Sequence, residues 1–434
     1  MKRYETYKDS GIQWWEEIPT HWDLKKAKHI FSLVTENVSD SSLPKIALEN
    51  IESWTGKYIE TNSDFMGEGV EFKKDDILFG KLRPYLAKVY KAEFAGQAVG
   101  DIYVFRGNEE QNPEYLKYLL LSYPFISVVD GSTYGAKMPR ANWDFISHLV
   151  LPCPPKTEQV TIAAFLDHKV GQIDATIAEK EQMLEDLKNY RSAIISEAVT
   201  KGLDKNVEMK DSGIEWLGMI PKHWGLVKLK NKAKVNGRIG FRGYTTADLV
   251  PKGQGAYTIG GKHITNCVID LSNPDFISWD KYYESPEIMV KKGDILMAQR
   301  GSLGKAALVR EDIGDATINP SLVLLNSIAM NEVFLYYYLV SSSCLAYIDL
   351  LNTATAVPMI SQNQIENIFV PIPSGKEQIQ IADYLDRKTK EIDETTIMVS
   401  TQISDLKSYK SALITEAVTG KIDLREWKSK EENV

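Results

Sequence analysis

The sequence predicts a mixed α/β protein in which one plan, a globular domain followed by a long helix, occurs twice. Three observations predict this fold class. Long motifs recur about two hundred residues apart, apolar residues recur every seven positions late in each copy, and short strand-like apolar segments fill the region before them. A chain of 434 residues is long enough for two or three domains.

The repeat is seen in pairs of matching segments. Residues 8–24, KDSGIQWWEEIPTHWDL, return without a gap as residues 210–226, KDSGIEWLGMIPKHWGL. Later pairs are 151–174 with 370–393 and 187–204 with 406–423. The offset grows from 202 residues in the first pair to 219 in the later ones, and most of the extra length falls before Asp294. Matching ends with diverging middles predict one scaffold that carries two differently specialised surfaces.

Each copy ends in a segment that predicts a long helix. Pro and a polar residue precede Glu-Gln, and no proline follows up to Val199 or Val418. Five heptads predict coiled-coil helices of about 40 residues, or roughly 60 Å at 1.5 Å per residue. The seam residues are Leu166, Val170, Ile173, Ile177, Lys180, Leu184, Leu187, Arg191, Ile194 and Ala198, and in the second copy Leu385, Thr389, Ile392, Thr396, Val399, Ile403, Leu406, Lys410, Leu413 and Ala417. We expect the two helices to pair with each other; the alternative is that each packs on its own domain.

The middle of each copy predicts mixed α/β structure. Short apolar runs bounded by Gly, Asp or Asn are typical of strands, and they occur as DDILFG, DIYVFRG, GDILMA and SLVLLN. Two longer apolar segments, NPEYLKYLLLSYPFI and MNEVFLYYYLVSSSCLAYI, predict buried helices.

Composition points to a cytoplasmic protein with an acidic body. No apolar run reaches membrane-spanning length, and the first residues, MKRYETYKDS, lack the apolar core of a signal peptide. Cys153, Cys267 and Cys344 are isolated and odd in number, which suits a reducing compartment. Because the net charge is −8, any nucleic-acid surface must be a local basic patch.

No catalytic centre is predicted. The fragment SNPDF resembles a methyltransferase loop only in part, because its third position is Asp and no Gly-rich turn accompanies it. GSLGK is too short for a phosphate loop, and Ala306 stands where a hydroxyl should bind magnesium. The six histidines lack metal-ligand spacing, so no metal site is predicted.

Loops in both copies instead combine basic, amide and aromatic side chains with glycine. Glycine lets a backbone approach phosphates, Lys and Arg neutralise them, and Arg, Gln and Asn can bond to purine edges. The DNA-binding candidates are Lys81, Arg83, Tyr85, Lys88, Tyr134, Lys137, Arg140 and Asn142 in the first copy and Arg238, Arg242, Lys262, Gln299, Arg300, Ser302 and Lys305 in the second. Any one of them is most simply an ordinary solvated side chain; the set as a whole favours nucleic acid.

These features together resemble the specificity subunit of type I DNA restriction-modification systems. The resemblance covers nearly the whole chain. It rests on Ile-Pro-x-His-Trp opening each copy, Gly/Asp-Asp-Ile-Leu near its middle, Pro-x-Pro-x-x-x-Glu-Gln opening each long helix and Glu-Ala-Val-Thr closing it.

The resemblance implies two target-recognition domains, residues 1–152 and 205–371, which each read one half of a split DNA site. It implies spacer helices within residues 153–204 and 372–434, the latter with the C-terminal tail. They form an antiparallel coiled coil with pseudo-twofold symmetry that sets the gap between the half-sites. The implied partners are double-stranded DNA, two methyltransferase subunits, and restriction or translocase subunits. S-adenosylmethionine, ATP and Mg are expected in those partners, and no cofactor is expected in this chain.

Two other functions compete with a non-catalytic DNA-specificity scaffold. A fused methyltransferase or nuclease would need the motifs that the sequence lacks. A coiled-coil adaptor that binds only proteins would not need basic, glycine-punctuated loops. A salt-dependent DNA-binding assay separates the adaptor from the scaffold.

Overall fold

The protein is described by a computed structural model that covers residues 2–12, 14–38, 43–61, 65, 67–133, 137–238, 243–352 and 357–428. Its contacts divide the chain into two compact units. Unit 1 is formed by residues 1–182 with 400–434, and unit 2 by residues 183–399. Each unit therefore combines a globular part with segments of both long helices.

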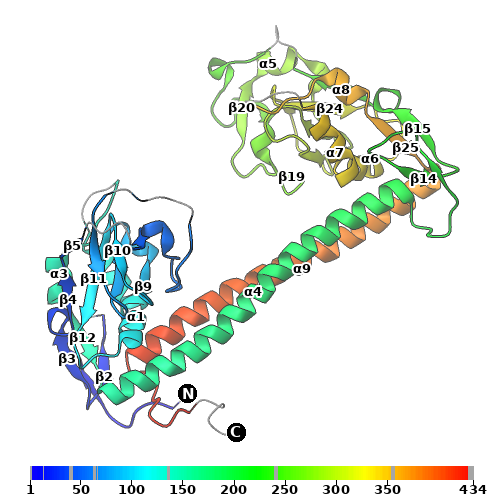
Figure 1. Ribbon diagram of the computed structural model, residues 1–434. Coiled ribbons are helices and arrows are strands. Elements are labelled where there is room, and N and C mark those ends of the chain that lie inside the picture. Colours follow the sequence, from blue (N-terminus) through cyan, green and yellow to red (C-terminus); the bar gives the residue numbers. More distant parts are fainter. Residues whose placement is uncertain are drawn as a thin grey trace. The chain divides into compact units, whose positions relative to one another are not determined.

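The globular part of unit 1 contains two main sheets (Figure 1). The first is antiparallel, in the order β4 (Phe31–Val34), β11 (Ile102–Gly107), β8 (Ile77–Gly80) and β9 (Val89–Lys91). The second has the order β5 (Asn37–Val38), β7 (Gly69–Phe72), β10 (Gly96–Ala98) and β6 (Lys45–Ile46), with β10 and β6 parallel. Phe72, Leu78 and Val104 belong to one buried apolar cluster, so the two sheets share a core.

Helices and two further strand pairs complete this part of unit 1. The helices are α1 (Pro113–Leu121), α2 (Tyr123–Gly131) and α3 (Trp143–His148). β1 (Tyr7–Asp9) pairs with β2 (Glu17–Pro19), and β12 (Val150–Cys153) pairs with β3 (Asp23–Lys26), all antiparallel. The β3–β12 pair returns the end of the globular part to its beginning, directly before the long helix.

Unit 2 repeats this plan. A sheet in the order β16 (Lys234–Gly237), β24 (Leu322–Asn326), β21 (Ile295–Ala298) and β22 (Ala306–Leu308) corresponds to the first sheet of unit 1. β13 (Met209–Asp211) pairs with β14 (Met219–Pro221), and β15 (Gly225–Lys228) with β25 (Phe369–Ile372). The helical part contains α6 (Glu332–Leu339), α7 (Ser342–Leu351) and α8 (Gln362–Glu366). The strands and buried helices predicted for the middles are confirmed in both units.

The second sheet is where the two units differ most. In unit 2 it has the order β20 (Asp275–Ser278), β17 (Gly255–Ile259) and β23 (Ala316–Ile318). Next to it in sequence lie a small hairpin of β18 (Ile264–Thr265) and β19 (Val268–Ile269) and the short helix α5 (Trp279–Tyr283). The extra residues of the second copy therefore lie in and beside this sheet.

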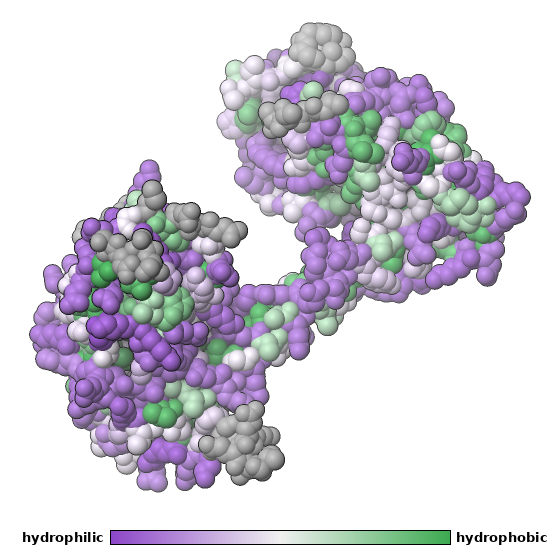
Figure 2. Space-filling model, viewed as in Figure 1, coloured by the Kyte–Doolittle hydropathy of each residue, from purple (hydrophilic) through white to green (hydrophobic). Residues whose placement is uncertain are grey.

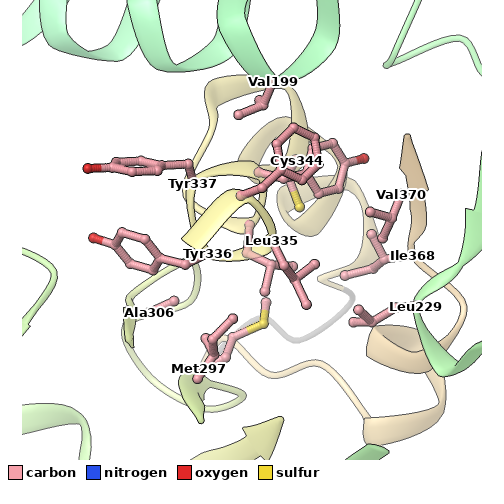
Figure 3. Close-up of a cluster of buried hydrophobic side chains, with 14 of the residues drawn as sticks. Val199, Leu229, Met297, Ala306, Leu335, Tyr336, Tyr337, Cys344, Ile368 and Val370 are labelled. Carbon is pink, nitrogen blue, oxygen red and sulfur yellow. The ribbon is translucent and has the colours of Figure 1, made fainter. Parts of the chain in front are cut away.

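The core of unit 2 is centred on α6 (Figure 3). Leu335 of α6 is fully buried, and its cluster includes Val199 of the first long helix, Met297 of β21 and Ile368. Among the described residues, no single helix has the length and apolar composition to cross a membrane; only α6 and α7 together, bent by 58°, meet both criteria. On the face shown in Figure 2, hydrophilic side chains cover most of each unit.

The two long helices are α4 (Lys156–Lys201) and α9 (Gly375–Val418). The predicted seam positions are all buried or half-buried. Residues that break the apolar seam each bond to the other helix: Lys180 to Gln402 at 2.6 Å, Lys410 to Asp174 at 2.8 Å and Arg191 to Asp393 at 3.1 Å. In unit 1, Asp174 meets Lys410 and Lys180 meets Gln402, so rising residue numbers along α4 meet falling numbers along α9 and the helices are antiparallel. Their pairing with each other is confirmed.

In unit 1 the repeated opening motif anchors the globular part to the first turn of α4. Nε2 of His21 lies 2.6 Å from Oε1 of Glu158, and the indole Nε1 of Trp22 donates to Oε2 at 3.0 Å. The hydroxyl of Tyr4 donates to the same Oε2 at 3.0 Å. Trp22 is completely buried. These contacts give His21 a structural, hydrogen-bonded role.

Unit 2 has the same anchor. Nε2 of His223 lies 2.8 Å from Oε1 of Glu377, and Nε1 of Trp224 donates to that oxygen at 3.3 Å. Burial opposes ionisation of Glu377, but hydrogen bonds from His223, Ser374 and Trp224 outweigh it and lower the pKa of this carboxyl to about 2. The anchor therefore holds a carboxylate at the N-terminus of α9, where the helix dipole also favours negative charge.

The glutamine after each anchoring glutamate ties the long helix to a core helix. Its side-chain oxygen accepts the backbone N–H of the residue that caps α1 or α6, and its amide donates to a proline carbonyl just before the long helix. The contacts are Gln159 with Asn112 (2.8 Å) and Pro154 (2.9 Å), and Gln378 with Asn331 (2.9 Å) and Pro373 (2.9 Å). The duplicated Glu-Gln is thus explained by position: one residue holds the opening motif, and the other holds the core helix.

Candidate nucleic-acid interface

In unit 1 the structure brings two predicted loops together at one end of strand β8. The N–H of Arg83 donates to the carbonyl of Pro139 at 2.8 Å, and the N–H of Ala141 donates to that of Lys81 at 2.8 Å. Segments 81–88 and 137–142 therefore form one paired structure, which we call the unit 1 tip.

Unit 2 has the same backbone arrangement at the end of β21. The N–H of Gly301 donates to the carbonyl of Pro358 at 2.8 Å, and the N–H of Ile360 donates to that of Gln299 at 2.9 Å. We call segments 299–305 and 357–360 the unit 2 tip. Sequence reasoning found the first segment and missed the second, although Pro139 and Pro358 are 219 residues apart, the offset of the later motifs.

The cations of the unit 1 tip differ in how far their charge is satisfied. Arg140 forms a bidentate pair with Asp101, at 3.1 and 3.0 Å, and Nζ of Lys81 lies 3.7 Å from the same carboxylate. Arg83 and Lys137 are exposed, and neither forms an ion pair with a described residue. Asp101 thus neutralises part of the patch and leaves two cations facing solvent.

Two other unit 1 candidates, Lys88 and Asn142, have structural contacts. The ammonium of Lys88 donates to the carbonyls of Leu48 at 2.6 Å and Ile51 at 2.9 Å, and burial lowers its pKa. Asn142 caps α3 by accepting the N–H of Asp144 at 2.8 Å. Tyr85 leaves 47% of its surface exposed beside Arg83. Tyr134 lies outside the described residues.

In the unit 2 tip, the side chains of Gln299 and Arg300 contact uncharged groups. The side-chain amide of Gln299 donates to the carbonyls of Pro320 at 3.0 Å and Leu322 at 3.3 Å. Arg300 is exposed, and its guanidinium lies 3.3 Å from Sδ of Met359. Ser302 and Lys305 are also exposed. The structure therefore brings together the four predicted residues between 299 and 305.

The remaining unit 2 candidates are placed differently. Arg238 is buried, and its guanidinium donates to the carbonyl of Ile318 and to Oγ1 of Thr317, both at 3.2 Å. Burial lowers its pKa, and its charge is directed into the unit, which removes it from the exposed set. Lys262 is exposed and pairs with Asp275 at 2.7 Å. Arg242 lies outside the described residues.

The two tips offer chemistry that suits DNA. Exposed Arg and Lys side chains neutralise phosphates, and the forked donors of Arg match the O6 and N7 acceptors of guanine. Within the described ranges, no cluster of His, Cys, Asp and Glu could hold a metal ion. The tips pair the same backbone positions and present different side chains.

Comparison with known proteins identifies relatives along most of the chain. The family described as the type I restriction modification DNA specificity domain matches residues 23–188 and 266–400. The EcoBI specificity subunit of a type I restriction enzyme of Escherichia coli is 24% identical over 371 residues, covering 82% of this chain and 75% of that protein. The putative MjaX specificity subunit of Methanocaldococcus jannaschii is 23% identical, covering 96% of this chain and 98% of that protein.

Solved structures share the fold. A chain from a type I R-M system, studied for complex assembly and conformational transition, has a TM-score of 0.74 at 16% identity and covers 93% of this chain and 99% of that one. The HsdS subunit from Thermoanaerobacter tengcongensis has a TM-score of 0.53 at 17% identity and covers 93% of this chain and 98% of its own.

Proposed function

Because the chain belongs to the type I restriction modification DNA specificity family, we propose that each of its two units reads one half of a bipartite DNA target through its tip. The chain is a specificity subunit, the non-catalytic component of a type I restriction-modification complex. DNA, methyltransferase subunits and restriction subunits are its partners, and the DNA substrate puts the assembly in the cytoplasm.

The division of labour follows the repeat. We assign residues 1–152 and 205–371 to target recognition, residues 153–204 to the first spacer helix, and residues 372–434 to the second with its tail. The antiparallel helices set the gap between the half-sites and provide docking surfaces. Since the anchors at Glu158 and Glu377 are built alike, the chain offers two equivalent positions, and we assign one methyltransferase subunit to each.

One observation carries this proposal: the two tips share their backbone pairing and differ in side chains. A scaffold that reads two different half-sites needs that combination, because the backbone positions the readers and the side chains choose the bases. A protein-only adaptor would not need exposed cations at both tips of an acidic chain. The readers that we propose are, among the exposed candidates, Arg83, Tyr85 and Lys137 in unit 1 and Arg300, Ser302 and Lys305 in unit 2.

The test is a domain exchange in the reconstituted complex. Residues 205–371 are replaced by the matching segment of a relative with a different target, and the methylated sites are sequenced. We expect the half-site read by unit 2 to change while the half-site read by unit 1 stays the same. The reciprocal exchange of residues 1–152 is the matched control. If either exchange altered both half-sites, the units would not be independent readers.

A second measurement separates the scaffold from the adaptor. Binding of the complex to a target duplex is measured over a range of salt concentrations. A DNA reader loses affinity steeply with salt because phosphate contacts release counterions. If the complex bound DNA no more tightly than the partner subunits alone, this chain would add no affinity for DNA, and it would be a protein-binding adaptor.

A further inference from the structure

Arg83 has an unusual backbone for an arginine. Its φ is +51°, in the left-handed region that disfavours residues with a Cβ. The corresponding residue of unit 2, identified by the same hydrogen bond to a proline carbonyl, is Gly301 with φ +82°. Unit 1 therefore places a long cationic side chain at a position where unit 2 has the residue best suited to the backbone.

Left-handed backbone alone does not mark a reader. Asp75 has φ +72° in the turn before β8, at the other end of that strand from the tip, and Gly293 of unit 2 has φ +90° at the equivalent place. Aspartate tolerates this conformation better than arginine does, and Nζ of Lys91 lies 3.7 Å from its carboxylate. Arg83 has neither the tolerance of aspartate for this backbone nor an ion-pair partner, since no described residue pairs with its guanidinium.

The backbone of Arg83 is fixed from both sides. Its N–H donates to Pro139, and its carbonyl accepts the N–H of Leu86 at 2.9 Å. Pro84 follows directly and starts the 3-10 helix η3 (Pro84–Leu86). A residue before proline favours extended backbone, so these two hydrogen bonds hold Arg83 in its left-handed conformation against that preference. The Cα of Arg83 is therefore held rigidly on the tip, which is what a side chain that reads one base requires.

The other cations of the unit 1 tip are less suited to reading. Arg140 and Lys81 face Asp101, and Lys88 donates to backbone carbonyls. Lys137 is exposed, but an ammonium is a point charge that suits a phosphate as well as a base. Among the cations of the unit 1 tip, all of which the structure describes, only Arg83 combines a rigid backbone, solvent exposure and a forked donor with no described partner.

We propose that Arg83 is the specificity-determining residue of unit 1 and reads a guanine in the first half-site by donating to its O6 and N7 atoms. The strained backbone is kept because it aims this side chain. The proposal rests on the proposed function, in which the tip faces DNA, and it adds which side chain reads and which base it reads.

The test uses the full chain with its methyltransferase subunits. Arg83→Gly removes the guanidinium and places at this position the residue that its backbone favours, and Arg83→Lys keeps the charge and removes the fork. Both variants should lose discrimination at one base pair of the first half-site, by about tenfold to a hundredfold, and keep the second half-site. The unfolding midpoint of Arg83→Gly should be equal to or above that of the wild type, so misfolding would not explain the loss.

The matched control is Asp75→Gly. It relaxes a left-handed residue of unit 1 away from the tip, and it should leave every base preference unchanged. If Asp75→Gly altered the methylated sequence as Arg83→Gly does, the lost base discrimination would come from the change in the backbone. Arg83 would then not be the residue that reads the base.

Two further outcomes would overturn the proposal in different ways. If Arg83→Gly weakened binding evenly over all sequences and lowered the salt slope by about one, Arg83 would be a phosphate contact. If the variant kept the complete wild-type pattern, Arg83 would lie outside the interface while the proposed function stood. A wild-type complex that methylated no bipartite site would contradict both the proposed function and this inference.

Discussion

The two units share the contacts that join each globular part to its helix and differ in the contacts at their tips. At the helix, a histidine and a tryptophan hold a glutamate in both units, with donor–acceptor distances between 2.6 and 3.3 Å. Next to the tip of unit 1, Asp101 bonds to Arg140 and lies near Lys81. The sheet register puts Ser321 at the corresponding position of unit 2, and its Oγ bonds to Asn319 at 2.5 Å. The fold therefore keeps the junction with the long helix alike in both units and lets the side chains at the tips differ.

A second contrast lies in the turn before β8 and β21. Asp76 is buried and pairs with Arg106, whose Nε and a terminal nitrogen donate at 2.8 and 2.6 Å. Asp294 occupies the same place in unit 2, but the register of the sheet puts Asn326 where unit 1 has the arginine. Burial raises the pKa of Asp294, and the bond from the N–H of Lys291 only partly compensates. The repeat therefore retains the aspartate of this turn in both units, but it retains the arginine partner only in unit 1.

The largest effect is expected where the units are alike. Trp22→Ala and Trp224→Ala each remove a fully buried indole and its bond to the anchoring glutamate. Each should lower the free energy of unfolding by about 3–5 kcal/mol. Hydrogen exchange should show the loss mainly in the unit that carries the change. Trp14→Ala, at a half-buried position of the same motif, is the control and should have a smaller effect. Equal loss of protection in both units would contradict independent anchors.

The buried aspartates should respond in opposite directions. Asp76→Asn breaks a charged bidentate pair and should lower the free energy of unfolding by about 1.5–3 kcal/mol. Asp294→Asn can still accept the N–H of Lys291, and it removes a carboxylate that burial disfavours, so stability at neutral pH should stay equal or rise. Urea unfolding of both variants measures the difference.

The pH dependence sharpens this comparison. Because the folded pKa of Asp294 lies above its usual value of 3.8, the folded state binds this proton more tightly than the unfolded state. Its contribution to stability therefore falls as pH rises from 3.8 through the folded pKa. Asp294→Asn should remove that decline. An unchanged pH profile in the variant would show that Asp294 ionises freely in the folded protein.

Sequence reasoning reached the architecture because its signals are local and repeated. Heptads, strand-like runs and duplicated motifs each depend on neighbouring residues, and the helix seams and the cores formed where these patterns predicted. The functions of Glu158 and Gln159 were not predicted, since their partners His21 and Asn112 are distant in sequence.

The tips show the same limit in the prediction of the site. Residue types suggested Arg238 and Lys88, yet burial and nearby carbonyls occupy both side chains. Composition cannot distinguish an exposed cation from one that donates into the interior. The segment 357–360 carries little charge, so no chemical signal marked it; only its backbone pairing with Gln299 and Gly301 places it at the tip.

The smallest difference is expected in the helix seam, where the two ion pairs are related by the repeat. Asp174 and Lys410 have side chains exposed by 13% and 9%, and Lys57 adds a second bond to Asp174 at 2.8 Å. In unit 2, Arg191 pairs with an Asp393 that is 56% exposed. Asp174→Asn should therefore cost about 1–2 kcal/mol, because it leaves two cations with a weaker acceptor, whereas Asp393→Asn should cost less than about 1 kcal/mol.

The pH dependence of the seam has a definite sign. Burial opposes ionisation of Asp174, but hydrogen bonds from Lys410 and Lys57 outweigh it and hold the pKa of this carboxyl below its usual 3.8. A depressed folded pKa gives stability that is present above 3.8 and is lost as pH falls through the folded value. Thermal unfolding from pH 7 to pH 2 should show wild type and Asp174→Asn converging at low pH, with Asp393→Asn tracking the wild type throughout. If the gap between wild type and Asp174→Asn stayed constant down to pH 2, Asp174 would act through packing and not through its charge.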